Sequence, residues 1–111
     1  MTDDIRTALI EKCRKALRRT GTAYDDEISD AIDAALIDLG IAGITNVSES
    51  DKLVIKAIKI FVKMDSGDFN DEYKDLKAAY DELKSEMGMN SQYTTFEETS
   101  EEDSNEAISN G

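Results

Sequence analysis

An acidic turn that begins at Asp65 comes closest to a metal-binding motif in this sequence. Hard cations such as calcium take carboxylate oxygens, and a calcium loop needs acidic or amide residues at alternate positions, followed by a glycine. Counted from Asp65, two of the required acidic positions hold Gly67 and Phe69. Counted from Asp68, the glycine position holds Tyr73. Neither count fits, so we expect an acidic turn that enters a helix, and no metal site.

Side chains able to act as nucleophiles or metal ligands are few. The chain has one cysteine and no histidine. A Ser-His-Asp triad, a Cys-His pair, an imidazole metal ligand, an internal disulfide and a four-cysteine zinc site are therefore excluded. Cys13 lies on the apolar side of a helical pattern, which favours a small buried side chain over a reactive thiol.

Neighbouring carboxylates such as Asp25 and Asp26 are the remaining candidates for acid–base chemistry. That chemistry needs a cleft that shifts their pKa values, and the sequence indicates none. Acidic residues at a helix start explain the pair better. We therefore predict no catalytic residue, no cofactor-binding residue and no metal ligand, and a protein that is not an enzyme.

Size and charge narrow the class of protein further. The chain has 111 residues, 25 acidic and 13 basic, so its net charge is −12 and its length suits one domain. Such acidity argues against tight binding to nucleic acid, which uses lysine and arginine to neutralise phosphates. The first residues lack the pattern of a signal peptide, and no apolar run approaches the roughly 20 residues that span a bilayer. We expect a small cytosolic protein.

Residues 1–87 have the periodicity of an all-α domain. Apolar residues recur at spacings of three and four between the glycines, and the chain has no proline. We expect four helices: one from about Ile5 that is stopped at Gly21 by a left-handed cap, one from Tyr24 to Gly40, one over 51–65 with Ser50 as N-cap, and one over 71–87 between Asn70 as cap and Gly88.

The third of these helices is the most apolar. Its lysines fall in one narrow strip, and apolar residues cover most of the remaining surface. A helix that is apolar over so wide an arc is buried on two sides, either at the centre of the domain or against a neighbouring subunit. The lysine strip consists of Lys52, Lys56, Lys59 and Lys63.

Residues 88–111 form an acidic C-terminal tail in this interpretation. They contain six of the 25 acidic residues, no basic residue and few apolar groups. Such a segment cannot bury enough apolar surface to offset its ordering entropy, so we expect it to be disordered in isolation. The alternative is a tail that orders on a partner, with Tyr93 and Phe96 as anchors.

Two groups of residues are candidates for an interface between subunits or with another protein. A domain this small is marginally stable alone, which makes oligomerisation useful. One group is apolar and has no place in the expected monomer core. The other is a basic cluster, which is either an ordinary solvated face or, in an oligomer, the complement of an acidic run on a neighbour. The hypothesis comprises Ile37, Ile41, Ile44 and Val47 in the apolar group, Arg14, Lys15, Arg18 and Arg19 in the basic cluster, and Asp25, Asp26, Glu27, Asp30 and Asp33 in the acidic run.

Several pieces of sequence follow one another in a characteristic order. They are Ala16-Leu17-Arg18, Tyr24-Asp25-Asp26-Glu27-Ile28, Ile32-Asp33-Ala34-Ala35, Asp38-Leu39-Gly40-Ile41, Leu53-Val54-Ile55-Lys56-Ala57-Ile58, Phe61-Val62-Lys63, and a helix with Tyr73, Leu76, Tyr80-Asp81 and Leu83-Lys84. This order resembles the small head–tail connector, or adaptor, proteins of long-tailed bacteriophages, often labelled phage DNA-packaging proteins. The resemblance covers about residues 5–87 and leaves out the acidic tail.

The resemblance implies an all-α subunit that assembles into a ring of about a dozen copies below the portal. The ring extends the DNA channel, joins capsid to tail and completes the head after DNA packaging. In this family the chain ends and the longest helices make the ring and portal contacts. The implied partners are the portal protein, a neck, stopper or tail-completion protein, and further copies of the chain, while DNA passes through without tight binding. The implied location is the capsid–tail junction of the virion, and the host cytoplasm during assembly.

A small acidic regulator, such as a DNA mimic that inhibits a nucleic-acid enzyme, is the alternative. A mimic needs carboxylates spread over one face of the folded body. Here the body carries all 13 basic residues beside 19 of the 25 acidic ones, which favours the connector.

Overall fold

A computed structural model of the chain describes residues 3–94, and all of its regular structure in this range is helical. The predicted all-α class is confirmed. The elements are α1 (Asp3–Ala16), α2 (Asp25–Ile41), α3 (Lys52–Ser66), the short 3₁₀ helix η1 (Asn70–Glu72), α4 (Tyr73–Gly88) and the one-turn α5 (Ser91–Thr94).

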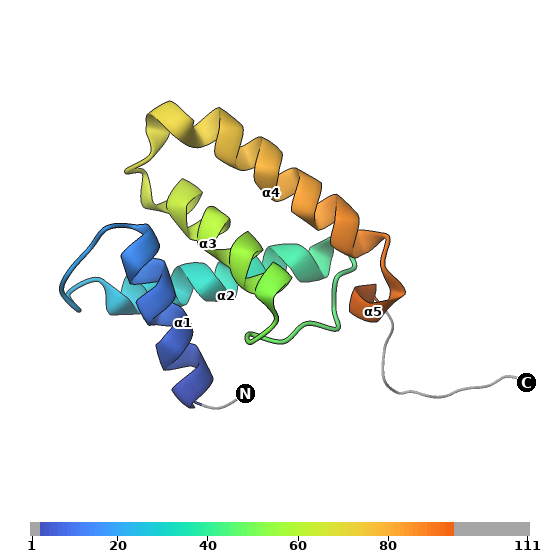
Figure 1. The fold of residues 1–111 in the computed structure, drawn as a ribbon, viewed down its shortest axis with the longest axis horizontal. Helices are drawn as coiled ribbons and strands as arrows, with labels where there is room; N and C mark the ends of the chain where they lie inside the picture. Colours follow the sequence, from blue (N-terminus) through green and yellow to red (C-terminus); the bar gives the residue numbers. More distant parts are fainter. Residues whose placement is uncertain (1–2, 95–111) are drawn as a thin grey trace, which may run out of the picture.

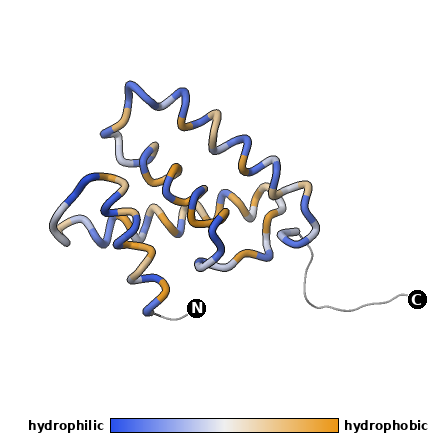
Figure 2. Tube along the Cα trace, in the orientation of Figure 1, coloured by the Kyte–Doolittle hydropathy of each residue, from blue (hydrophilic) through white to orange (hydrophobic). Residues whose placement is uncertain are grey.

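The helices are arranged around α3, which contacts α1, α2 and α4. Figure 1 shows α3 in the middle of the molecule, with α4 along one side, α1 toward the other side and α2 running behind. The prediction that the third helix is buried on two sides is therefore confirmed, and it lies at the centre of the domain. Figure 2 shows many of the apolar positions along α2 and α3, in the middle of the molecule.

The core is built from the predicted apolar stripes. Helix α2 buries Ile28, Ala31, Ile32, Ala35 and Leu39, as its periodicity predicts. The stripe of α4 is buried only in its second half, at Tyr80, Leu83 and Met87. Tyr73, at the first position of the helix, is 46% exposed. The other core side chains are Leu9, Cys13, Leu17, Ile44, Val54, Ala57, Ile58, Val62, Tyr80, Leu83, Met87 and Tyr93.

The end of α1 differs from the prediction. The helix ends at Ala16, and Arg18 rather than Gly21 takes the left-handed conformation, with φ of 61°. The Arg19 N–H donates to the Arg14 carbonyl at 3.0 Å, and the Arg18 N–H donates to the Lys15 carbonyl at 3.0 Å. This hydrogen-bond pair is a Schellman cap, which normally uses glycine at the left-handed position. The predicted stop at Gly21 is therefore wrong.

Helix α2, in contrast to α1, ends later than predicted, beyond Gly40. Gly43 has φ of 89°, and the Ile44 N–H donates to the Leu39 carbonyl at 2.9 Å. The left-handed glycine of this cap is thus Gly43. Gly40 is an ordinary helical residue one position before the last residue of α2.

The caps of α3 and α4 correct two further predictions. Asp51, not Ser50, is the N-cap of α3, because its Oδ1 accepts the N–H groups of Leu53 at 2.9 Å and Val54 at 3.2 Å. Asn70 begins η1 and its side chain does not cap α4, so the predicted cap is absent at that position. The prediction that α4 ends at Gly88 is confirmed.

The first residues of the predicted tail belong to the folded body. Tyr93 on α5 is 5% exposed, and its hydroxyl donates to both carboxylate oxygens of Asp51, at 3.2 and 3.1 Å. The Asn46 N–H donates to the Tyr93 carbonyl at 2.9 Å, and the Asn46 side chain donates to the Gln92 carbonyl at 2.8 Å. Tyr93 is therefore an anchor within its own chain, and the body reaches at least residue 94. Phe96 and the rest of the predicted tail lie outside the described residues.

Candidate interaction surface

The outer side of α2 exposes two large apolar side chains to solvent. Ile37 is 64% exposed and Ile41 is 81% exposed, although both lie within a helix whose opposite side is in the core. Asp26 and Asp30 are exposed on the same side, because positions 26, 30, 37 and 41 repeat at close to the helical period. We call the exposed stripe of Asp26, Asp30, Asp33, Ile37 and Ile41 the outer face of α2. It is acidic toward its start and apolar toward its end.

Two of the four apolar interface candidates lie elsewhere. Ile44 is 1% exposed and belongs to the core, and Val47 is half-buried against it. The link after α2 folds back over the end of the domain, so both side chains find a place inside one chain. The reasoning that placed Ile44 and Val47 outside the monomer core is therefore wrong. The interface hypothesis stays a prediction for Ile37 and Ile41 alone.

The basic cluster is partly neutralised within the chain. The Arg14 guanidinium donates to both carboxylate oxygens of Asp25, at 3.2 and 3.0 Å. The Arg19 guanidinium donates to Asp68 at 2.8 Å and lies 4.5 Å from the centre of the Tyr24 ring. These pairs connect α1 and the α1–α2 link to the start of α2 and to the α3–η1 turn.

The other two members of the basic cluster are exposed. Lys15 has only a loose pair with Glu11, at 3.8 Å, and Arg18 projects from the cap of α1. The expected match between this cluster and the acidic run of a neighbour therefore involves fewer charges than the sequence indicates.

The lysine strip of α3 is a second basic surface. Lys52 and Lys56 are exposed, and Lys59 and Lys63 are half-buried. The Lys63 ammonium lies 5.1 Å from the centre of the Phe69 ring. None of the four lysines has an ion-pair partner within residues 3–94.

A polar network around Arg6 is absent from the sequence-based expectations. The Arg6 guanidinium donates to Glu49 Oε1 at 3.0 Å and Oε2 at 2.7 Å, to the Ser29 hydroxyl at 3.0 Å and to Asp33 Oδ1 at 2.9 Å. The Glu49 side chain is 1% exposed. The hydrogen bond to Glu49, more than that to Asp33, raises the pKa of Arg6 further above its ordinary range. The one signal in the sequence is that Arg6 is the first basic residue in an acidic N-terminal stretch.

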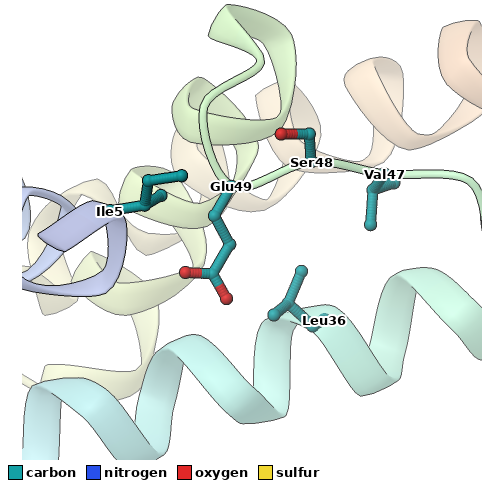
Figure 3. A pocket seen from close by; sticks show the side chains of 5 residues that line it. All are labelled: Ile5, Leu36, Val47, Ser48 and Glu49. Carbon is teal, nitrogen blue, oxygen red and sulfur yellow. The ribbon is translucent and has the colours of Figure 1, made fainter. Parts of the chain in front are cut away.

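A pocket of about 290 Å³ opens beside this network. Figure 3 shows Ile5 of α1, Leu36 of α2 and Val47, Ser48 and Glu49 of the link around it, with the Glu49 carboxylate directed between α1 and α2. Both carboxylate oxygens accept hydrogen bonds from Arg6. The pocket therefore combines apolar walls with a neutralised carboxylate and with the Ser48 hydroxyl, which lies 2.8 Å from the Ser50 hydroxyl.

A smaller network joins α2 to α4. The Tyr80 hydroxyl donates to Asp38 Oδ2 at 2.7 Å, and Lys84 donates to the same oxygen at 3.1 Å. The Tyr80 hydrogen bond, aided by Lys84, lowers the pKa of Asp38. Burial, followed by the hydrogen bond to Asp38, raises the pKa of Tyr80 above its ordinary range. The network fixes the second half of α4 against α2.

The remaining chemical candidates behave as structural groups. Cys13 is fully buried, and burial raises the pKa of its thiol to about 11. Within residues 3–94, acidic and cysteine side chains do not gather into a group that would hold a metal ion. No helix in the described part of the chain is long and apolar enough to cross a membrane.

Comparisons with family models, with curated proteins and with solved structures give no match for this chain.

Proposed function

We propose that this chain is a structural head–tail connector, or adaptor, subunit that forms a ring below the portal of a long-tailed bacteriophage. The ring extends the DNA channel and joins capsid to tail once DNA has been packaged. The order of sequence pieces described above supports the proposal, and the four long helices agree with the all-α subunit that the resemblance implies.

The exposed isoleucines of α2 are the observation that carries the proposal. Ile37 and Ile41 lie one turn apart on the outer face of α2 and are 64% and 81% exposed, whereas the next most exposed isoleucine or leucine within residues 3–94, Leu53, is 39% exposed. Apolar groups gathered on one surface and bordered by charges are typical of a protein–protein contact. A subunit that joins identical neighbours needs such a surface.

The mechanism requires no catalysis. A ring interface is heterologous, so one patch of each subunit meets a different patch of the next, and the ring closes when the rotation per subunit allows it. A net charge of −12 per subunit gives a repulsive field to DNA, so that DNA slides through the channel without sticking.

Electron microscopy of the purified protein, alone and mixed with the portal protein of the same phage, tests the proposal. We expect rings that stack coaxially on the portal. The variant Ile37→Asp/Ile41→Asp should abolish the rings, and Thr7→Asp/Ala8→Asp on exposed positions of α1 serves as a control. A 12.3 kDa monomer that leaves the portal bare would contradict the proposal and would favour the acidic regulator.

A further inference from the structure

We propose that the outer face of α2 in one copy of the chain docks, antiparallel, on the lysine strip of α3 in the next copy. This inference rests on the function proposed above, because it names the two surfaces that join neighbouring subunits.

The two surfaces have the same spacing along their helices. The outer face of α2 repeats at Asp26, Asp30, Asp33 and Ile37, with steps of four, three and four residues. The lysine strip, Lys52, Lys56, Lys59 and Lys63, has the same steps. At a rise of about 1.5 Å per residue, each row is about 16 Å long. Every acidic group of one row therefore meets a lysine of the other without a shift in register.

Most of the charges on the two surfaces have no ion-pair partner within residues 3–94. Asp26 and Asp30 form no ion pair with another residue of the range 3–94, and neither do the four lysines. Asp33 binds Arg6, but its side chain is 56% exposed. The acidic row and the basic row are thus complementary and available, which favours a specific orientation between copies.

An antiparallel orientation matches the apolar groups as well. Ile37 and Ile41 lie at the end of α2, and Leu53, which is 39% exposed, lies at the start of α3 beside Lys52. Antiparallel docking places these ends together, and the aliphatic stem of Lys52 covers apolar surface. It also opposes the two helix dipoles. Parallel docking would place Ile37 against Lys63 and leave Leu53 beside an acidic group.

The two surfaces point in opposite directions, which makes the contact head to tail. Helices α2 and α3 contact each other, and the helical period places the outer face of α2 and the lysine strip of α3 opposite the buried residues of their own helices, so the two surfaces lie on opposite sides of the pair. A contact between unlike patches on opposite sides leaves both patches free at the ends of a dimer, and it propagates to further copies.

Charge-swap variants of the full chain test the pairing. We expect Asp26→Lys/Asp30→Lys and Lys59→Glu/Lys63→Glu each to lower the apparent association constant in sedimentation by more than about 10-fold, because like charges then face each other. An equimolar mixture of the two variants should regain the wild-type value to within about threefold, since each junction again joins unlike charges. Circular dichroism should show unchanged helicity in each variant.

Two further variants make the test selective. Glu72→Lys/Asp75→Lys changes the charge equally at exposed acids near the start of α4 and should associate as the wild type does. Lys52→Glu/Lys56→Glu should fail to restore assembly with Asp26→Lys/Asp30→Lys. Restoration by this variant instead of Lys59→Glu/Lys63→Glu would overturn the antiparallel orientation.

The outcomes separate this inference from the proposed function. Rings that form unchanged with every charge-swap variant would overturn the inference and leave the connector function in place. Open filaments or dimers that show the predicted swap pattern would support the inference and contradict the ring. A wild-type chain that stays monomeric at about 1 mM, where specific weak interfaces associate, would overturn the inference.

Discussion

Arg6 holds three parts of the chain together through one guanidinium group. It binds Glu49 in the link before α3, and Ser29 and Asp33 on α2, while its own backbone belongs to α1. Glu49 is the one charged residue within the range 3–94 that is buried, with 4% of the whole residue exposed. A carboxylate so far from water is stable only while its partner remains in place.

Replacement of Arg6 tests this role. We expect Arg6→Ala to lower the free energy of unfolding by about 3 kcal/mol, because it leaves Glu49 buried without a cation. Urea denaturation followed by circular dichroism measures the change. Lys15→Ala, which removes only the loose and exposed pair with Glu11, is the control and should leave the midpoint nearly unchanged. Equal midpoints for the two variants would show that the Arg6 pair contributes little.

The burial of Cys13 should lower the free energy of unfolding at alkaline pH. Burial raises the pKa of its thiol to about 11 in the folded chain, whereas an unfolded thiol ionises near a pKa of about 8.5. Above pH 8.5 the unfolded state loses its proton first, so the free energy of unfolding falls as pH rises toward 11. Urea midpoints between pH 8 and 10 should therefore decline in the wild type and decline less in Cys13→Ala. Parallel curves would contradict this assignment.

At the scale of the elements, the helix bodies could be predicted and several helix ends could not. The stripes of α2 and α3 depend on local periodicity, which the sequence shows directly. The caps at Arg18, Gly43 and Asp51 depend on how the links fold back onto the domain. In each case a neighbouring residue, such as Ser50 beside Asp51, suits the same role by its chemistry alone.

The candidate surface could be predicted only in part, for a related reason. Ile37 lies opposite a regular stripe, so the period of α2 indicates its exposure. Ile44 and Val47 follow the helix in a link without periodicity, and only the folded link shows that they reach the core. Glu49 is a charged link residue, a type that is usually solvated, so nothing local indicates its burial.

The caps of α2 suggest a pair of glycine substitutions with opposite effects. Gly43 has φ of 89° and Gly40 is helical, and an added Cβ would meet no atom within 4 Å at either position. Gly43→Ala should therefore lower the free energy of unfolding by about 1 kcal/mol through backbone strain alone. Gly40→Ala should raise it by about 0.5–1 kcal/mol through helix propensity. Denaturant midpoints that shift in the same direction would contradict the assigned cap.

Isoleucines near the end of α2 and in the link after it should respond differently to a change to aspartate. Ile37→Asp/Ile41→Asp should keep far-UV helicity and the unfolding midpoint, while the protein elutes later from a sizing column if the wild type is assembled, because both side chains are exposed. Ile44→Asp should lose helicity, since it places a charge in the core. An unchanged elution volume for the first variant, beside an assembled wild type, would exclude its two residues from the contact.

At the scale of the whole molecule, charge is the property with the widest effect. All 13 basic residues lie in the part of the chain up to Lys84, and several of them are bound to carboxylates of the same chain. The remaining cations, which include the lysine strip, are outnumbered by acidic residues, because the chain has 25 acidic residues and 13 basic ones. The field at a distance is therefore that of an anion.

This charge predicts weak contact with DNA. We expect the purified protein to bind duplex DNA with a dissociation constant weaker than about 10⁻⁴ M, even at low salt. Fluorescence anisotropy of a labelled duplex at 20–200 mM salt measures it, and a basic protein of similar mass is the positive control. Tight binding at low salt with a steep salt dependence would contradict a repulsive channel.

The burial of Cys13 has a practical consequence for optical measurements. It is the single cysteine of the chain, and it is fully enclosed by the core of the folded domain. We therefore expect the native protein not to react with maleimide dyes. A cysteine introduced at an exposed site of α2 or α3 would accept a fluorophore alone, so energy transfer between labelled copies can follow their approach in real time.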